Sequence, residues 1–277
     1  MTLEAAPTGV DVSTPNVARI YDYFLNGKDN FAADREAAEQ IIRAAPATRA
    51  TAWANRHFLA RVVRFLALEA GIDQFLDIGC GLPTQHNVHE VAQAARPDAS
   101  VVYVDNDTMV LTHARALLAT QPRTVVIGGD LHDPDAILLD PELRSVLDLD
   151  RPVALLMLSV LHCVPDDEPV RRSVRRFREV LAPGSYLAVS HITRPTASSA
   201  YRRNAEQGAR TYKDLGVNMS MTFREREQLV ELFRGWEVLP PGLVNLPDWR
   251  PDPCPEPTSM CELPATYLCG VARMITR

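Results

Sequence analysis

The stretch Phe75-Leu-Asp77-Ile-Gly79-Cys-Gly81-Leu-Pro83-Thr84 decides the fold. Apolar residues that end in an acid are followed by two glycines and then by a segment with helical periodicity. Gly79 and Gly81 allow a tight turn and a close approach of the backbone to a ligand, and the N-terminus of the next helix offers free N–H donors. The stretch therefore predicts a strand, a turn and a helix around a site for a nucleotide-like cofactor.

Downstream of Asp73, short apolar runs alternate with amphipathic segments, which is the pattern of an α/β fold with a buried parallel sheet. We expect strands at 74–78, 100–105, 124–128, 152–158 and 185–191, and helices at 84–95, 107–119, 168–181 and 197–215. A capping box, Thr222-Phe-Arg-Glu225, predicts one more helix. Two closing strands are expected at 236–239 and 266–274. The proline-rich segment 240–264 between them is predicted to be an ordered loop, which either serves the site or simply joins the strands.

Residues 1–71 contain no strand candidate and are predicted to form a helical extension, which packs as one unit with a domain at 72–277. Thr14 followed by Pro15 suits the start of a helix that ends near Asn26-Gly27. Further helices are expected at 34–45 and 51–70.

The acid before the glycine turn indicates which cofactor is bound. Asp77 would repel the pyrophosphate that a dinucleotide site holds at this turn. S-Adenosylmethionine has no phosphate and carries an ammonium and a sulfonium, so a carboxylate there attracts it. Pro83-Thr84 also replaces the third glycine of the dinucleotide fingerprint. The stretch therefore favours S-adenosylmethionine over NAD(P).

The next two strands also end in carboxylates. Asp105 is placed to accept both ribose hydroxyls, with Asn106 beside it, although Asp105 to Asp107 can instead cap the following helix. Asp130, followed by Leu131, can accept a hydrogen bond from an adenine amino group. Three successive strands thus place three carboxylates along one edge of the sheet.

The fourth strand ends in Ser159-Val-Leu-His162. In a doubly wound sheet, ligands bind at the switch point between the first and fourth strands, so Ser159 is expected at the reactive end of the cofactor. His162 is either a general base or a core histidine with satisfied hydrogen bonds.

Together these features resemble the class I S-adenosylmethionine-dependent methyltransferases over about residues 71–277. The resemblance implies a Rossmann-like, seven-stranded sheet of order 3-2-1-4-5-7-6 whose last strand is antiparallel. It also implies that Asp77, Gly79 and Gly81 hold the methionine portion, Asp105 the ribose, and Asp130 with Leu131 the adenine. Pro83 departs from the pattern of the wider class.

The opening Thr14-Pro-Asn-Val-Ala-Arg-Ile-Tyr-Asp-Tyr-Phe-Leu-Asn-Gly-Lys-Asp-Asn-Phe-Ala-Ala-Asp34 is similar to that of an actinomycete-type family known only as S-adenosyl methyltransferase, formerly a domain of unknown function. The glycine loop, Pro83 included, fits this family. The resemblance implies no particular substrate.

Polar side chains are unusually frequent between Tyr21 and Phe31. Asn26 and either Tyr21 or Tyr23 can close over the cofactor, with a tyrosine ring facing the sulfonium. The alternative is an amphipathic helix that ends in an Asn-Gly cap. Side chains from Trp53 to His57, among them Asn55 and Arg56, can also reach the site.

Charge and composition limit the classes of binding partner that we expect. The 277 residues carry a formal net charge of −6, which gives no overall field for a nucleic acid. No apolar run is long enough for a bilayer and the N-terminus lacks signal-peptide features, so neither a membrane partner nor secretion is expected, and the cytoplasm is the default compartment. The scattered cysteines suggest no disulfide framework and no metal site.

We therefore expect a methyltransferase that acts on a small-molecule oxygen, nitrogen or carbon nucleophile. A non-catalytic S-adenosylmethionine-binding regulatory module is one alternative, and an NAD(P)-binding oxidoreductase is a less favoured one. The oligomeric state is open.

Overall fold

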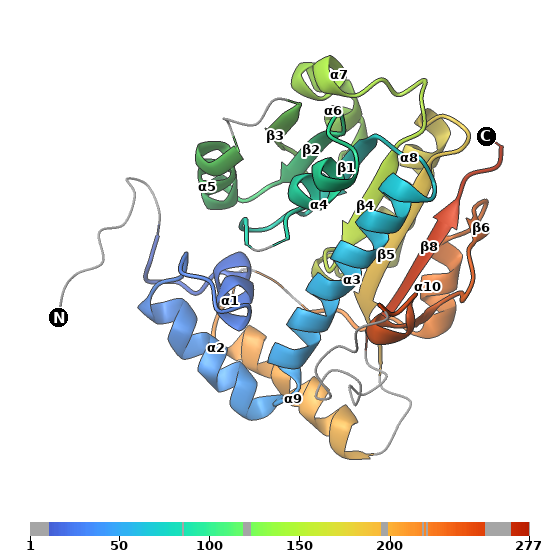
Figure 1. Ribbon diagram of the computed structural model, residues 1–277. Helices are drawn as coiled ribbons and strands as arrows, with labels where there is room; N and C mark the ends of the chain where they lie inside the picture. The colour runs from blue at the N-terminus through green and yellow to red at the C-terminus, as the bar shows by residue number, and fades with distance from the viewer. Residues whose placement is uncertain are drawn as a thin grey trace.

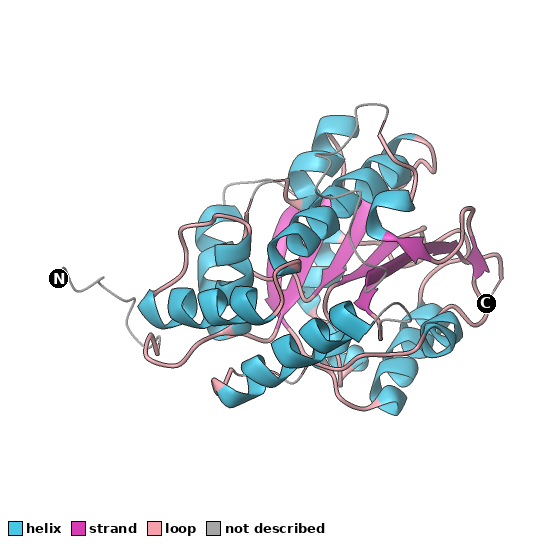
Figure 2. Ribbon diagram, turned by 90° about the horizontal axis from the view of Figure 1, so that it is seen from below, coloured by secondary structure: helices cyan, strands magenta, loops and turns pink. Residues whose placement is uncertain are grey.

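The computed structural model describes residues 11–84, 86–118, 123–194, 199–217, 219, 221–252 and 267–276. A central sheet has helices on both of its faces, and the first two helices lie beyond one end of it (Figures 1 and 2). The elements follow in the order α1 (Val17–Phe24), α2 (Ala32–Ala44), α3 (Thr48–Leu68), β1 (Gln74–Ile78), α4 (Val88–Ala95), β2 (Ser100–Asp105), α5 (Thr108–Leu118), β3 (Thr124–Gly128), α6 (Pro134–Leu139), α7 (Pro141–Val146), β4 (Ala154–Leu158), the 3₁₀ turn η1 (Leu161–Cys163), α8 (Asp167–Val180), β5 (Tyr186–Ile192), α9 (Ser199–Asp214), α10 (Arg226–Leu232), β6 (Glu237–Val238), β7 (Val244–Asn245), the 3₁₀ turn η2 (Leu246–Asp248) and β8 (Tyr267–Arg273).

The strands lie in the order β3-β2-β1-β4-β5-β8-β6, and β7 pairs with β8 off this path. Strands β1 to β5 pair in parallel, whereas β8 is antiparallel to β5 and β6. The expected order 3-2-1-4-5-7-6 with an antiparallel last strand is thereby confirmed. The sheet has eight strands instead of the expected seven. The additional strand is the two-residue β7, which lies within the proline-rich segment. Residues 253–266, which include most of the rest of that segment, lie outside the described residues.

The sheet is buried on both faces because neighbouring side chains of one strand join different clusters. Phe75 packs in a cluster with residues of α3, α4 and α5, whereas Leu76 packs in one with residues of α6, α7, α8 and α10. All five residues of β1 are buried, as are all five of β4. Near-continuous apolar strands are typical of a parallel sheet with two covered faces.

Two predicted N-terminal capping residues are wrong. Asn16, not Thr14, caps α1, because its Oδ1 accepts hydrogen bonds from the backbone N–H groups of Ala18 at 2.9 Å and Arg19 at 3.2 Å. Glu225, not Thr222, caps α10, and its own N–H donates to Gln228 Oε1 at 2.7 Å.

The helix expected at 84–95 begins only at Val88. Asn87 caps it, and its backbone N–H donates to Glu90 Oε2 at 2.8 Å. The short helices α6 and α7 were not predicted, although each starts with a proline after an aspartate cap, Asp133 and Asp140.

Helices α1, α2 and α9 form a cap over the carboxyl ends of the strands (Figure 1). Ile20, Phe24, Ile41 and Tyr212 share the apolar cluster of this cap. Helix α3 runs from the cap to one face of the sheet, where Phe58 is fully buried. The predicted extension and the predicted domain at 72–277 thus meet along α3 and α9. Among the described helices, none has both the length and the apolar character that crossing a membrane requires.

Candidate cofactor and active site

A cavity of about 440 Å³ lies between the carboxyl ends of the strands and the cap. Its walls include residues of α1 and α3, the loops after β1 to β4, and residues of α9 and β8. This volume is within the usual range for small-molecule sites, about 300 to 1,000 Å³.

The three predicted strand-end carboxylates all line this cavity. Asp77 is the last residue but one of β1, Asp105 ends β2 opposite Gly128 of β3, and Asp130 follows β3. Because these strands are parallel neighbours, their carboxyl ends meet at one edge of the sheet. The structure therefore brings Asp77, Asp105 and Asp130 together as the order of the strands requires.

The glycine turn follows β1 and is fixed to the end of β2. Gly79 and Gly81 have φ angles of 72° and 64°. A Cβ atom on Gly79 would lie 2.3 Å from Val160 Cγ2, so only glycine fits there. The N–H of Gly81 donates to Asp105 Oδ2 at 2.9 Å. The two glycines therefore keep the backbone close to β4 and to the Asp105 carboxylate.

Asp105 and Asp107 have different roles, although both line the cavity. Asp107 Oδ1 accepts from the N–H groups of Met109 at 2.8 Å and Val110 at 3.2 Å, so it caps α5. Asp105 accepts from the N–H groups of Gly81 and Asp107 but does not cap the helix. Burial raises the pKa of Asp105, while these two N–H bonds oppose the shift. The capping alternative thus holds for Asp107 only, and Asn106 between them also lines the cavity.

Asp77 and Asp130 lie in different electrostatic surroundings. Burial raises the pKa of Asp77 to about 7, the charge of Arg56 opposes this rise, and the charge of Asp105 adds to it. Asp130 is partly exposed. Burial acts to raise its pKa, but hydrogen bonds from the backbone and ring of His132, at 2.8 Å and 2.7 Å, outweigh this and lower it. Leu131 lines the same part of the cavity.

Ser159 lies directly after β4 and has a φ of 62°, which is unusual for a residue other than glycine. Its N–H donates to Ser190 O at 3.0 Å, and its hydroxyl is hydrogen-bonded to that of Tyr267, the first residue of β8. Such backbone conformations are frequent at functional sites. Both hydroxyl-bearing residues line the cavity.

His162 lines the cavity from η1 and is largely buried. Its Nδ1 is shielded from solvent and has no hydrogen-bond partner among the described residues. Burial lowers the pKa of His162 to about 4, and the charge of Arg224 contributes to this. The ring packs edge to face against Tyr267 and His191. Burial therefore keeps the His162 imidazole neutral near pH 7, and one of its two ring nitrogens has no partner in the described part of the chain.

Arg224 holds the loop that carries His162. Its guanidinium donates to Leu161 O at 2.7 Å and to Val164 O at 2.9 Å, and Nε pairs with Asp167 Oδ1 at 2.8 Å. The side chain is almost completely buried. It therefore connects both ends of the loop to the chain just before α10.

Helices α1 and α3 contribute Tyr21, Asn55 and Arg56 to the cavity wall. Asn55 Nδ2 donates to the Tyr21 hydroxyl at 3.0 Å, and Ser190 Oγ donates to Asn55 Oδ1 at 2.6 Å. This chain of hydrogen bonds, from β5 through α3 to α1, fixes the Tyr21 hydroxyl in the cavity wall.

Tyr23 and Asn26, which were expected to close over a cofactor, are not among the residues that line the cavity. The Tyr23 hydroxyl donates to Glu39 Oε1 at 2.7 Å, and Arg49 donates to Asn26 Oδ1 at 2.8 Å. Both side chains thus stabilise the packing of the cap. Trp53 and His57 contact each other and do not line the cavity either.

Other lining residues were not singled out from the sequence. Tyr212 and Gly208 come from α9, Tyr267 from β8, and Met219 and Met221 from the segment after α9. They reach the cavity because α9 packs on α2 and because β8 starts at the same edge at which the parallel strands end.

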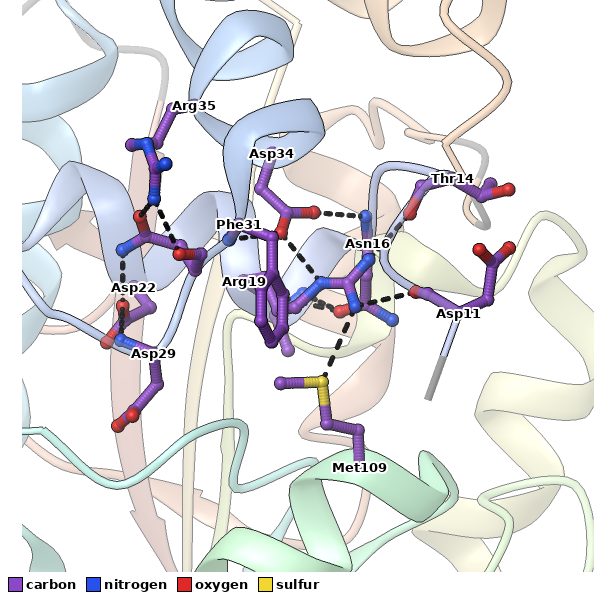
Figure 3. Close-up of polar contacts among 12 residues, drawn as sticks. Asp11, Thr14, Asn16, Arg19, Asp22, Asp29, Phe31, Asp34, Arg35 and Met109 are labelled. Atoms are coloured by element: carbon purple, nitrogen blue, oxygen red, sulfur yellow. Dashed lines mark hydrogen bonds and ion pairs between the residues drawn. The ribbon is translucent and has the colours of Figure 1, made fainter. Parts of the chain in front are cut away.

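Helix α1 anchors the cap to the start of α5. Figure 3 shows the Asp34 carboxylate between Arg19 and the backbone of Asn16 and Phe31. Arg19 Nε lies 2.8 Å from Asp34 Oδ2, and both side chains are buried. Asn16 Nδ2 in turn donates to Asp107 Oδ2 at 2.6 Å. The start of α1 is thereby tied both to α2 and to the start of α5.

The sheet order, the antiparallel β8 and the glycine turn with carboxylates after successive strands define a class I S-adenosylmethionine-dependent methyltransferase. The chain belongs to the S-adenosyl methyltransferase family, whose model matches residues 3–275. S-Adenosylmethionine is the cofactor of this family.

Solved structures agree with this assignment. A DUF574 family protein from Streptomyces avermitilis is 41% identical, with a TM-score of 0.86, over 95% of this chain and 99% of that one. A protein from Thermobifida fusca is 40% identical, with the same TM-score, over 99% of this chain and 100% of that one. A more distant S-adenosylmethionine-dependent methyltransferase from Methanosarcina mazei, 16% identical with a TM-score of 0.50 over 74% of this chain and 93% of that one, shares the fold alone. No curated protein matches the chain.

Proposed function

We propose that the chain methylates a small, neutral and largely apolar molecule that enters the cavity beside the cofactor. The observation that carries this proposal is the continuity of the cavity from the acids after β1, β2 and β3 to an apolar end at the cap. A module that only binds the cofactor has no need of this apolar part of the wall. The apolar end is walled by Ile41, Ala45, Ala209, Tyr212, Met219 and Met221.

The proposed cofactor placement follows from charge. Asp77 would bind the ammonium, Asp105 with Asn106 the ribose, and Asp130 with Leu131 the adenine, while Gly79 and Gly81 admit the backbone to close contact. Bound S-adenosylmethionine supplies a methyl group that its sulfonium already activates. The donor set fits this group, because the buried Asp77 and the half-buried Asp105, both with raised pKa values, gain from a nearby cation.

The acceptor would lie against the loops and strands on the other half of the sheet edge. The described lining residues from β4 to β8, α9 included, contain no Asp, Glu, Lys or Arg. A charged acceptor would lose its hydration there without gaining a partner. The hydroxyls of Tyr21, Ser159 and Tyr267 can orient a polar group on an otherwise apolar molecule.

His162 is the proposed catalytic residue. Neutral imidazole can accept a hydrogen bond from the O–H or N–H of the acceptor and take its proton as the nucleophile attacks the methyl carbon. Positioning and exclusion of water supply most of the remaining rate.

Binding and labelling experiments test this function. Isothermal titration with S-adenosylmethionine should give a saturable isotherm that Asp105→Ala weakens and the surface variant Asp135→Asn does not. With methyl-labelled cofactor and a metabolite extract of Streptomyces avermitilis, label should enter small molecules that organic solvent extracts. Label in protein or nucleic acid, or none above a boiled control, would contradict the proposed acceptor class.

A further inference from the structure

Arg56 is the only arginine or lysine among the described residues that line the cavity. It belongs to α3, in the N-terminal extension rather than in the glycine-loop unit. Its charge lowers the pKa of the buried Asp77, so the guanidinium acts on the end of the cavity where the glycine turn lies.

Asn87 links Arg56 to the loop that follows the glycine turn. Arg56 Nη2 donates to Asn87 Oδ1 at 2.9 Å, and the same oxygen accepts from the N–H of Thr84 at 3.1 Å. Asn87 Nδ2 donates back to Thr84 O at 2.8 Å. The guanidinium of Arg56 and the backbone of Thr84 therefore share one partner at the start of α4.

The side-chain hydroxyl of Thr84 has an unfilled hydrogen bond. Thr84 lines the cavity, and its Oγ1 is shielded from solvent without a partner among the described residues. Leaving a buried hydroxyl unpaired costs free energy. An acceptor supplied by a ligand beside Arg56 would remove that cost.

The methionine end of S-adenosylmethionine carries a carboxylate as well as an ammonium. The acids of the cavity repel the carboxylate, so it requires hydrogen-bond donors and a positive charge. A guanidinium presents five N–H donors in a planar fork that matches a carboxylate.

We propose that Arg56 and the Thr84 hydroxyl bind the carboxylate of the cofactor, and that Asn87 is the positioning residue that holds both beside it. This inference rests on the cofactor placement proposed above. It makes α3 of the N-terminal extension part of the cofactor site, so the cofactor bridges the extension and the glycine turn. It also predicts discrimination against ligands that lack the carboxylate.

Removing the carboxylate from the ligand tests the subsite directly. Affinities of S-adenosylmethionine and of decarboxylated S-adenosylmethionine are measured by titration for the wild type, Arg56→Met, Arg56→Lys and Thr84→Val. Arg56→Met should weaken the carboxylate-bearing ligand roughly 10- to 100-fold, and Thr84→Val about 3- to 10-fold. Arg56→Lys should give an intermediate loss. Affinity for the decarboxylated ligand should fall by a smaller factor than affinity for S-adenosylmethionine in all three variants, because what remains for this ligand is the effect of the Arg56 charge on Asp77.

Arg64→Met is the matched control. Arg64 lies on the same helix, pairs with Asp252 at 2.6 Å on the surface and does not line the cavity, so its loss should affect neither ligand. Thermal melts verify that the variants fold. The proposed subsite would be overturned if Arg56→Met lowered the affinity for both ligands equally, or for neither. Failure of the wild type to bind either ligand would instead overturn the proposed function, and the subsite with it.

Discussion

The carboxyl group of Asp77, at the end of β1, is buried near that of Asp105, at the end of β2, and burial together with the charge of Asp105 raises the pKa of Asp77 to about 7. The positive charge of Arg56 only partly opposes this rise. Ionising both acids is therefore costly until a cation lies between them, which is the property expected of a preformed site for a cationic cofactor.

Cofactor affinity should depend on pH through Asp77. The ammonium of the cofactor favours the ionised carboxylate, so binding lowers the pKa of Asp77 and releases a proton. With a free-state pKa of about 7, affinity should rise roughly eightfold between pH 6 and pH 7.5. Titrations in two buffers of different ionisation enthalpy measure the proton release. Asp77→Asn should bind weakly and with no such dependence. A flat profile for the wild type would contradict the assignment.

The same carboxyl should make the cofactor-free protein less stable at high pH. Because the folded-state pKa is raised above the usual 3.8, the stabilising contribution of protonated Asp77 is complete below pH 4 and is lost as pH rises through 7. Asp77→Asn removes this loss. The free energy of unfolding of Asp77→Asn, relative to that of the wild type, should increase by about 3 kcal/mol between pH 5 and pH 8. Urea titrations measure it, and the exposed Asp98→Asn should show no such growth.

The sheet could be predicted closely because its strands are short apolar runs with clear ends. The bounds of β1, β2 and β3 agree with the prediction to the residue. Helix starts were less predictable where the chain offers two capping residues in succession. Thr14 precedes a proline, but Asn16 caps α1 and also bonds to Asp107, 91 residues away. A tertiary contact of this kind leaves no local pattern in the sequence.

The lining residues at the strand ends could be predicted, whereas those that the cap and β8 contribute could not. Tyr21 and Tyr23 are two residues apart on one helix, so they point to different sides, and the sequence does not tell which side faces the cavity. Only Tyr21 lines it. Tyr212 and Tyr267 come from separate elements that meet through packing of α9 and the antiparallel pairing of β8.

The buried pair of Asp34 and Arg19 should determine the stability of the cap. Asp34 also accepts from the N–H groups of Asn16 at 2.9 Å and Phe31 at 2.8 Å (Figure 3). Asp34→Ala leaves a buried guanidinium without its counterion, which should cost about 3–5 kcal/mol in free energy of unfolding. Hydrogen exchange should rise first in α1 and α2. Glu39→Gln, in an exposed pair with Arg49, should cost less than about 1 kcal/mol. Equal effects of the two variants would contradict this role.

Arg224 should act on His162 through both its geometry and its charge. Arg224→Met leaves three backbone carbonyls, those of Leu161, Val164 and Asp166, and the Asp167 carboxylate without the guanidinium that they share, so we expect a loss of about 3–5 kcal/mol in free energy of unfolding. It also removes a charge that helps to lower the pKa of His162. Arg224→Lys keeps the charge but not the planar fork, and should cost about 1–3 kcal/mol. Urea unfolding measures both losses.

Imidazole NMR titration distinguishes the two effects of Arg224. The pKa of His162 should rise in Arg224→Met and stay low in Arg224→Lys, because only the second variant retains a cation near the ring. Arg178→Met is the control, since the half-buried Arg178 donates to Gly235 O at 3.5 Å and does not line the cavity. The same pKa for His162 in all four proteins would mean that burial alone keeps this imidazole neutral, and Arg224 would then act only by holding the loop.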